Sequence, residues 1–403
     1  MNPLLISGFG TNISVDKRRL IIQNKLENQR YEYYPHQIKH DSVIVDGHSG
    51  SISFEAMRWL VKHNIPIAML NWNGNLLSVT LPKETVSSKL RLKQYKIYQD
   101  GKRRYSIAYP LVKEKVNQSI NLLNELSKYY KEIDVSTIRT ESEREGIFKL
   151  KITYDYHNLM MYEGRIADIY WSQILNAFNN LCPEFKFVSR NNTLNSHNRN
   201  ASDEINALLN YGYAVLESEV RKDLNSIGLD PSISFLHELS NSRASLVYDI
   251  QELYRWLVDL SVIQLLEEKR LQKADFIVTE NYNIRLRETT AKALIEKIKL
   301  NFNARALYNG KYYCYQNILY ENVRLLANYI IGKSGKLQFN IPEFKIKRED
   351  NTGIRNKVLN LTPEDRKTLG INKSTLWYMQ KHIKEGRKIK VYGKVMGKLN
   401  GEN

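Results

Sequence analysis

Short apolar runs alternate with Gly, Asn and Asp over about the first eighty residues of the chain. Runs of β-branched or leucine-rich residues that are bounded by such turn residues are typical of β-strands. The expected strands are residues 4–7, 19–23, 42–46, 66–70 and 76–81. One helix interrupts them at residues 53–64, where Ser53 can cap a first turn that precedes apolar residues at helical spacing. The pattern therefore predicts a small β-rich domain over residues 1–83.

The pattern changes after Pro82 to long stretches with apolar residues three and four positions apart. This spacing places the apolar side chains on one face of a helix. The clearest such stretches are residues 112–130, 158–178, 201–227 and 245–268. Because few β-like runs lie among them, we expect a large all-α domain over residues 88–340.

The C-terminal part begins after a polar, Gly- and Pro-containing segment, residues 341–356, which is typical of a linker. Thr362 can cap a helix that has Pro363 at its first position and Asp365 in its first turn. Gly370 ends that helix, and Asn372 can cap a second, lysine-rich one. Two short helices with a glycine between them have the form of a helix–turn–helix, although a plain helical hairpin packed on the core has the same pattern.

The basic tail RKIKVYGKVMGK favours the interpretation that residues 357–403 form a helix–turn–helix DNA-binding domain. The expected fold class is therefore a multidomain α+β protein. It comprises a β-rich N-terminal domain, an all-α catalytic domain and the C-terminal helix–turn–helix.

The charge of the chain points to a polyanionic partner. Sixty Lys and Arg residues stand against 43 Asp and Glu residues, which leaves a net charge of +17 and a pI near 9.5. Nucleic acid is one such partner, but membranes and other polyanions also attract basic proteins.

Cysteine usage and hydropathy exclude several classes of protein. Cys182 and Cys314 lie far apart and have no Cys or His at metal-ligand spacing, which excludes a zinc ribbon and a disulfide scaffold. No apolar stretch is long enough to span a bilayer, and the N-terminal run is broken by Gly8 and Gly10. We therefore expect a cytoplasmic protein.

Acidic side chains lie beside apolar positions in two of the expected helices. Asp249 and Glu252 have the i, i+3 spacing that places two carboxylates on one helix face, next to apolar residues. Glu163 also has apolar and aromatic neighbours, Gly164 could allow close approach beside it, and His237 ends a short apolar run. Because a carboxylate beside an apolar surface is costly without a cation, a shared metal site is one interpretation.

Each of these residues also has an ordinary structural interpretation. A single glutamate on an amphipathic helix is usually a solvated edge residue, and a single histidine is usually a hydrogen-bonded structural residue. The carboxylates at positions 249 and 252 could also pair with Arg243 or Arg255. From the pattern alone, the structural interpretation is the commoner one.

Ordered motifs between Asp203 and Asp259 resemble the CRISPR-associated integrase superfamily, which comprises the spacer-acquisition nucleases of CRISPR systems and their transposon-borne relatives. The superfamily pattern is a D-x-x-N-x-x-L-N-Y-G-Y helix, then G-L-D-P, F-L-H and S-L-x-x-D-x-x-E. The chain matches it at Asp203, Asn206, residues 209–213, residues 228–231, residues 235–237, Ser245, Leu246, Asp249 and Glu252. The glutamate helix also matches at Glu163, Tyr170 and Trp171, and the resemblance covers roughly residues 1–335.

This resemblance implies a metal-dependent DNA integrase and endonuclease. Carried over residue by residue, it makes Glu163, His237 and Glu252 the catalytic metal ligands, with Asp249 as a supporting or alternative ligand. Two carboxylates and an imidazole suit Mn²⁺ or Mg²⁺. Such a metal would polarise a phosphodiester, and the 3′-hydroxyl of a donor DNA end would attack the target strand.

DNA is the implied partner, and the dimerisation of the superfamily through its β domain implies a homodimer. Arg165 and Arg243 are candidates for DNA contacts near the site, and Lys373 and Lys381 for contacts with the target duplex. Any of the four could instead be an ordinary surface charge.

Two positions depart from the superfamily pattern without replacing an implied ligand: Ser234 stands in place of a glycine, and Trp256 in place of a proline. The larger departure is the C-terminal extension, because members from CRISPR loci commonly end near the end of the α domain. The extension resembles the casposases, which are integrases of self-synthesising transposons. The alternatives are a CRISPR spacer-acquisition integrase that works with a small ferredoxin-like partner, and a non-catalytic DNA-binding protein of the same fold.

Overall fold

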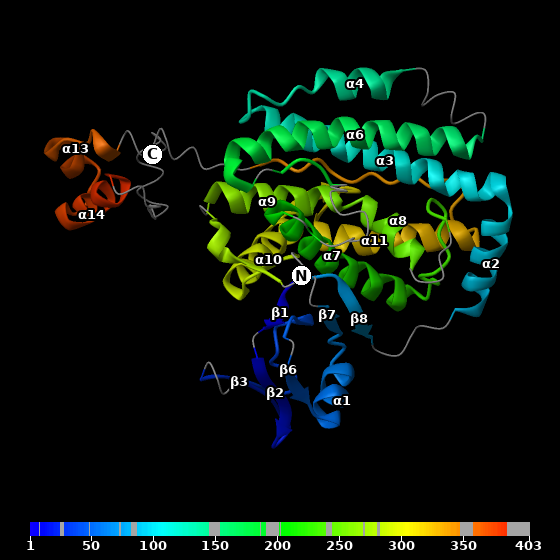
Figure 1. Ribbon diagram of the computed structural model, residues 1–403, viewed down its shortest axis with the longest axis horizontal. Helices are drawn as coiled ribbons and strands as arrows, with labels where there is room; N and C mark the ends of the chain where they lie inside the picture. Colours follow the sequence, from blue (N-terminus) through cyan, green and yellow to red (C-terminus); the bar gives the residue numbers. More distant parts are fainter. Residues whose placement is uncertain are drawn as a thin grey trace. The chain divides into compact units, whose positions relative to one another are not determined.

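The chain folds into two compact units, Met1–Phe344 and Lys345–Asn403. The computed structural model describes residues 1–7, 9–24, 28–47, 49–71, 74–81, 87–144, 154–185, 187–190, 201, 203–238, 244–268, 271–279, 283–346 and 358–384. The first unit has a β-rich N-terminal part followed by a mainly helical part (Figure 1). This arrangement confirms the expected α+β fold class. The domain boundaries at residues 83, 88 and 340 stay predictions.

Two four-stranded sheets form the N-terminal part. The strands of the first sheet are, in order, β1 (Pro3–Ile6), β5 (Ser42–Val45), β7 (Ile67–Leu70) and β8 (Leu76–Thr80). In this sheet β1 and β7 lie parallel to β5, and β8 lies antiparallel to β7. The second has the order β4-β3-β2-β6, with β4 (Gln29–Tyr33), β3 (Arg19–Asn24), β2 (Phe9–Asp16) and β6 (Ser49–Ile52). All five expected strands form. The sequence pattern missed β2, β4 and β6 because polar residues interrupt their apolar runs.

Helix α1 (Phe54–Lys62) completes this part of the core. The Ser53 hydroxyl accepts a hydrogen bond from the Ala56 backbone N–H at 3.1 Å, which confirms the expected N-cap. Leu60 is fully buried and packs in one cluster with Leu20 of β3 and Val43 of β5. The two sheets therefore share a hydrophobic core with α1.

The helical part is assembled around α7 (Glu204–Ile227), which is buried along most of its length. It packs against α8 (Ser245–Glu252), α9 (Arg255–Glu268), α10 (Glu288–Asn303) and α11 (Tyr315–Ile331). Gly212 allows α7 and α9 to approach closely, because a Cβ there would lie 2.5 Å from Cγ1 of Val258. The remaining layer comprises α2 (Ser88–Gln99), α3 (Gly101–Ser127), α4 (Ser136–Glu143) and α6 (Tyr156–Leu181).

The helical part differs from the sequence expectation in two places. The single helix expected over residues 245–268 is interrupted at Leu253 and Tyr254, because the indole N–H of Trp256 donates to the Leu253 carbonyl at 3.0 Å and takes the place of a helical N–H. The part expected to be all-α also contains two short hairpins. These are β9 (Phe276–Val278) with β10 (Ile284–Leu286), and β11 (Arg305–Tyr308) with β12 (Lys311–Cys314).

The start of the expected linker packs on the helical part. Ile341 is buried, and its backbone N–H donates to Glu114 on α3 at 2.9 Å. The amide of Gln118, one turn later, donates to the Ile341 carbonyl at 2.8 Å. Residues 341–344 therefore belong to the first unit, and residues 347–357 lie outside the described part of the chain.

The second unit contains α13 (Pro363–Thr368) and α14 (Lys373–Lys384). Thr362 and Asp365 exchange hydrogen bonds in a capping box, with Pro363 at the first helical position, as the sequence predicts. Gly370 has φ +62° between the two helices, which favours glycine. The basic tail after residue 384 lies outside the described residues.

A buried carboxylate lies where α7 meets the N-terminal part. Asp223 is 4% exposed, and its Oδ2 accepts no hydrogen bond from any described residue. Close by, Ser42 of β5 donates to Glu219 at 3.3 Å, and Lys222 pairs with Glu219 at 2.5 Å. Burial raises the pKa of Asp223 to about 8, against the weaker opposing effect of Lys222.

This carboxyl should make the stability of the protein depend on pH. Its pKa in the folded state lies above the ordinary 3.8, so the folded protein holds the proton more tightly than the unfolded chain. The free energy of unfolding should therefore fall as pH rises from about 4 to about 8, with a limiting slope of about 1.4 kcal/mol per pH unit from this group. Urea unfolding at pH 5 and pH 9 should show that the gain in stability of Asp223→Asn over the wild type is larger at pH 9 than at pH 5. An equal difference at both pH values would contradict this assignment.

Candidate active site

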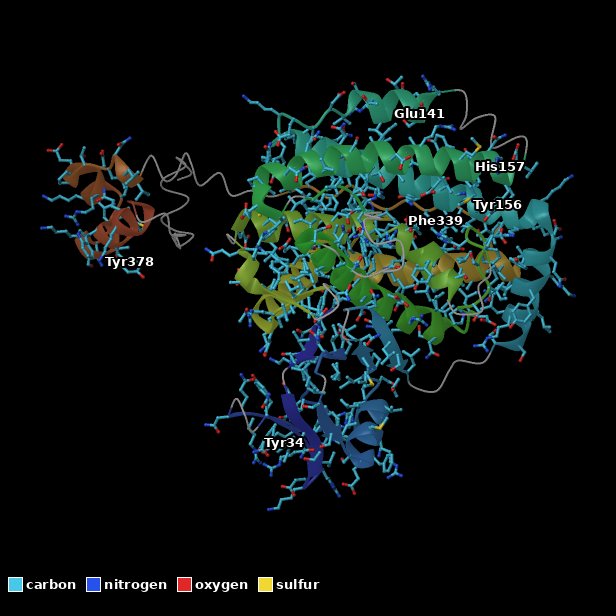
Figure 2. The ribbon with its side chains drawn as sticks, viewed as in Figure 1. Tyr34, Glu141, Tyr156, His157, Phe339 and Tyr378 are labelled. Atoms are coloured by element: carbon cyan, nitrogen blue, oxygen red, sulfur yellow. The ribbon has the colours of Figure 1, made fainter. Side chains whose placement is uncertain are left out.

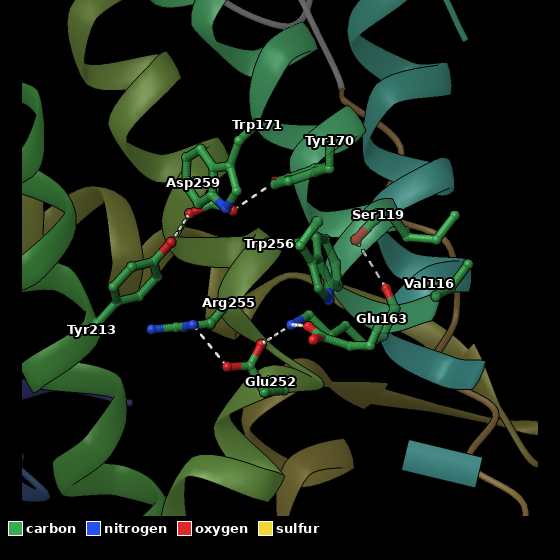
Figure 3. A pocket seen from close by; sticks show the side chains of 13 residues that line it. Val116, Ser119, Glu163, Tyr170, Trp171, Tyr213, Glu252, Arg255, Trp256 and Asp259 are labelled. Atoms are coloured by element: carbon green, nitrogen blue, oxygen red, sulfur yellow. Dashed lines mark hydrogen bonds and ion pairs between the residues drawn. The ribbon is translucent and has the colours of Figure 1, made fainter. Parts of the chain in front are cut away.

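Two glutamates from different helices, both labelled in Figure 3, converge on one lysine. Glu163 lies on α6, a helix whose N-terminus is capped by Asp155. Glu252 is the last residue of α8. The ammonium of Lys115, on α3, pairs with the Glu163 carboxylate and lies 2.7 Å from Oε2 of Glu252. The carboxylates are 17% and 8% exposed and the lysine is 20% exposed, so the three charges meet in a largely buried place.

Glu252 has a second cationic partner. Nη1 of Arg255, at the start of α9, lies 2.7 Å from Oε1 of Glu252. Burial by itself raises the pKa of the Glu252 carboxyl, but Arg255 and Lys115 outweigh it and lower the pKa to about 2. Arg255 is the pairing partner that the structural interpretation of the sequence named for this carboxylate. Arg255 follows Glu252 by three positions, a spacing at which side chains meet.

His237 is oriented by Asp249. Its ring nitrogen Nδ1 lies 2.7 Å from Oδ1 of Asp249, so the ring presents its other nitrogen, Nε2, away from that carboxylate. Burial lowers the pKa of His237, but the hydrogen bond and the charge of Asp249 outweigh it, and the pKa is raised above its ordinary value. Glu252 and Lys115 both act electrostatically on the imidazole, so His237 lies within electrostatic range of Glu252.

Asp249 is fully buried, and its two oxygens are occupied by hydrogen bonds. Besides the His237 ring, its donors are the Ser234 hydroxyl and the backbone N–H groups of Phe235, Leu236 and His237, at 2.6 to 3.1 Å. Ser234, which stands where the superfamily usually has glycine, thus contributes a hydroxyl to this network. The structure brings Asp249 to the histidine and not to the pair of glutamates.

Arg104 of α3 holds the segment that carries His237 from the other side. Its Nε donates to the Phe235 carbonyl at 3.0 Å and its Nη2 to the His237 carbonyl at 3.3 Å. The guanidinium lies over the rings of Tyr98 and Tyr156, at 4.8 and 4.6 Å from their centroids. Tyr156, labelled in Figure 2, also donates to the Phe235 carbonyl at 3.1 Å. The histidine segment is therefore fixed by α3, α6 and α8 together.

A narrow cavity of about 40 Å³ lies beside the glutamates. Its lining includes Asp259, whose carboxylate accepts hydrogen bonds from the hydroxyls of Tyr170, at 2.6 Å, and Tyr213. Burial raises the pKa of Asp259 to about 6. The guanidinium of Arg255 lies 4.4 Å from the centroid of the Tyr213 ring (Figure 3). Asp259 and the two tyrosines thus support the arginine that holds Glu252.

The site can be compared with the needs of a divalent cation. Two carboxylates and an imidazole with one free nitrogen are suitable donors for Mn²⁺ or Mg²⁺. The Lys115 ammonium occupies the position between the carboxylates, so the site already holds one positive charge. As placed, no three His, Cys, Asp or Glu side chains of the described residues lie close enough together to hold an ion. The chemistry of the donors suits a divalent cation, and binding one would require Lys115 to leave the carboxylates and the three side chains to come closer together.

The four residues expected to contact DNA lie in different surroundings. Arg165 is half exposed and pairs at 2.9 Å with Glu141 of α4, which is labelled in Figure 2. Arg243 lies outside the described residues. Lys373 is exposed at the start of α14, and the Lys381 ammonium lies 5.0 Å from the centroid of the exposed Trp377 ring. Next to Glu163, the space around Gly164 is open, so no close approach requires this glycine.

Sequence reasoning missed Lys115 and Arg104. Lys115 has Leu111 and Ser119 four residues to either side, and both are buried. A lysine on the apolar face of an amphipathic helix was a signal that could have identified it. Arg104 had no such signal, because its partners are backbone carbonyls and rings of distant segments.

Among the helices of the described residues, none is long and apolar enough to cross a bilayer.

The chain is similar to known proteins over most of its length. The family described as "CRISPR associated protein Cas1" matches residues 4–299. CRISPR-associated endonuclease Cas1 1 of Archaeoglobus fulgidus is 26% identical over 342 residues, which cover 82% of this chain and 96% of that protein. CRISPR-associated protein Cas1 3 of Methanobrevibacter ruminantium is 30% identical over 287 residues, or 68% of this chain and 80% of the relative.

A solved structure described as a casposase bound to integration product superimposes with a TM-score of 0.79. It is 37% identical in sequence, and the match covers 89% of this chain and 99% of that one.

Proposed function

We propose, on the premise that this chain belongs to the Cas1 family, that it is a metal-dependent integrase and endonuclease that joins 3′-hydroxyl ends of donor DNA to target DNA. One observation carries the proposal: Glu163 and Glu252, from two different helices, converge on the ammonium of Lys115, within electrostatic range of His237. A site of this kind is suited to a divalent cation that acts on a phosphodiester.

In this proposal Glu163, His237 and Glu252 hold the metal, Mn²⁺ or Mg²⁺. When bound, the metal supplies Lewis-acid stabilisation of the charge that develops on the phosphate and the leaving oxygen. Asp249 keeps the proton of His237 on Nδ1 and leaves the lone pair on Nε2 available. We assign Asp249 this positioning role and not that of a ligand, because its oxygens already accept five donors.

The reaction is a transesterification. A bond forms between the donor 3′-oxygen and a target phosphorus, the bond from that phosphorus to its former 3′-oxygen breaks, and the proton that the attacking hydroxyl loses is matched by one that the released 3′-oxygen gains. Arg255 keeps Glu252 ionised and in place through its ion pair. Arg104 holds the His237 segment. Both residues keep the donor atoms in one arrangement before DNA binds, which lowers the reorganisation that the reaction needs.

We further propose that residues 357–403 bind duplex DNA, with Lys373 and Lys381 as phosphate contacts. Arg243 and Arg165 are candidates nearer the site, and Arg165 would first leave Glu141. The β-rich residues 1–83 would form a homodimer, and the protein would act in the cytoplasm, where the DNA of a cell without a nucleus lies.

We favour integration of the casposase type over CRISPR spacer acquisition. The supporting observation is the likeness to a casposase at 37% identity over 89% of this chain, which extends past the residues matched by the family. The curated relatives described as CRISPR-associated endonucleases support the alternative, in which a small ferredoxin-like partner is required. A non-catalytic DNA-binding protein would have no need for two largely buried glutamates beside a histidine.

The test is a strand-joining assay with the purified protein alone. A labelled duplex with a 3′-hydroxyl end and a supercoiled plasmid would be incubated with Mn²⁺ or Mg²⁺. We expect labelled plasmid products that disappear with EDTA and in a His237→Ala protein purified in the same way. Joining that requires a ferredoxin-like partner and a repeat-containing target would support spacer acquisition. If neither condition gives joining, the integrase proposal is wrong.

A further inference from the structure

Lys115 is unusual because a lysine lies on the buried face of a long helix. It is 20% exposed, while Val116 beside it and Leu111 one turn earlier are almost fully buried. Removing an ammonium from water is costly unless anions meet it. Here both Glu163 and Glu252 meet it, so the ammonium is paired and offsets part of the charge of the two carboxylates.

The two carboxylates depend on Lys115 to different degrees. Glu252 also pairs with Arg255 at 2.7 Å. Among the described residues, the ion pair of Glu163 is with Lys115 alone. Without this ammonium, two largely buried anions would face each other, and among the described residues the one remaining ion pair would be that of Arg255 with Glu252. A cation at this point is therefore required for the two helices to keep the carboxylates together.

We propose that Lys115 is a displaceable cation, which holds the metal-ligating carboxylates together in the metal-free protein and competes with the divalent metal for them. This inference rests on the proposed function, since it takes Glu163 and Glu252 as metal ligands. The two carboxylates cannot both remain paired with the ammonium and coordinate a divalent cation at the same time. Lys115 thus raises the metal concentration at which the site fills, and metal binding moves the ammonium away from the two carboxylates.

A permanent salt bridge predicts the opposite effect of removing the lysine. If Lys115 only held the ligands in place, Lys115→Met would disorder them and weaken metal binding. If Lys115 competes, the neutral side chain of similar length removes a positive charge from the metal position, and metal binding tightens. The sign of the change in affinity distinguishes the two roles.

The experiment measures Mn²⁺ binding without DNA, by the loss of the free-ion EPR signal on titration. We expect Lys115→Met to bind Mn²⁺ about tenfold or more tightly than the wild type, an order-of-magnitude figure for removing one nearby like charge. Lys113→Met is the matched control, because Lys113 is exposed on the same helix and its loss removes the same net charge. Unchanged or weaker binding by Lys115→Met would overturn the inference.

Glu252→Gln separates this inference from the proposed function. If it binds Mn²⁺ as tightly as the wild type, the metal lies elsewhere and both proposals fail. If it loses Mn²⁺ while Lys115→Met keeps the wild-type affinity, only the competition fails.

A second measurement needs no variant, in case Lys115→Met does not fold. The wild-type protein would be acetylated briefly with and without Mn²⁺, and the modified lysines identified by mass spectrometry. Displacement predicts that Mn²⁺ increases the labelling of Lys115 severalfold and leaves that of Lys113 unchanged. Labelling of Lys115 that stays the same or falls on adding Mn²⁺ would contradict displacement.

Discussion

Glu252→Gln is expected to slow strand joining by roughly a hundred- to a thousandfold, the range seen when a group that stabilises transition-state charge is removed. Glutamine keeps the shape of the side chain but lacks the charge that Arg255 and Lys115 meet. The low pKa of Glu252, about 2, means that the carboxylate is ionised throughout the range in which the protein can be assayed. Glu163→Gln should behave in the same way. The measurement is the single-turnover rate of joining a labelled 3′-hydroxyl duplex to plasmid.

Binding of duplex DNA provides the control for these variants. Phosphate contacts come from basic residues, so the affinity measured by fluorescence anisotropy should stay within about threefold of the wild type. Glu296→Gln makes the same chemical change at an exposed position of α10 and should leave the joining rate unchanged. A Glu252→Gln protein that joined strands at the wild-type rate would remove this residue from the site.

Asp249→Asn should produce the second large effect, through His237. An asparagine amide keeps one acceptor oxygen, but its N–H groups would face donors, such as the Phe235 backbone N–H and the His237 ring, whose hydrogen bonds the carboxylate accepts in the wild type. Unmet buried donors should lower the free energy of unfolding by about 1–3 kcal/mol. Loss of the support for the imidazole should weaken Mn²⁺ binding by about 10- to 100-fold. Urea unfolding and EPR titration measure the two quantities, and Asp168→Asn, at an exposed position of α6, is the matched control.

The pKa of His237 gives an independent measure of the same interaction. In the wild type the pKa is raised above its ordinary value by Asp249, against the opposing effect of burial. The ion pair therefore stabilises the fold below the pKa of the unfolded chain, and this contribution is lost as pH rises through the folded pKa. NMR titration of the ring should show a lower pKa in Asp249→Asn. A pKa equal to that of the wild type would mean that Asp249 does not hold the imidazole.

Local patterns in the sequence were sufficient for several elements. Ser53 caps α1, and Thr362 with Asp365 forms a capping box, because these hydrogen bonds join residues three positions apart. Apolar periodicity predicted the long helices and five of the strands, since the same spacing recurs wherever one face is buried. The ordered motifs identified the family, which the comparisons confirm. The roles of Glu163, His237 and Glu252 stay predictions until the variants are made.

The tertiary structure decided how these residues are held. Lys115 lies 48 residues from Glu163 along the chain, and only the packing of α3 against α6 brings the two together. The helix expected to run through Tyr254 is interrupted because a tryptophan side chain donates to a backbone carbonyl, a bond that periodicity does not report. Asp249 and Glu252 share a helix face by spacing, yet Asp249 bonds to the histidine ring and Glu252 pairs with the lysine. Sequence determines features whose partners lie within a few residues, whereas charge pairing depends on which distant side chains the fold brings into contact.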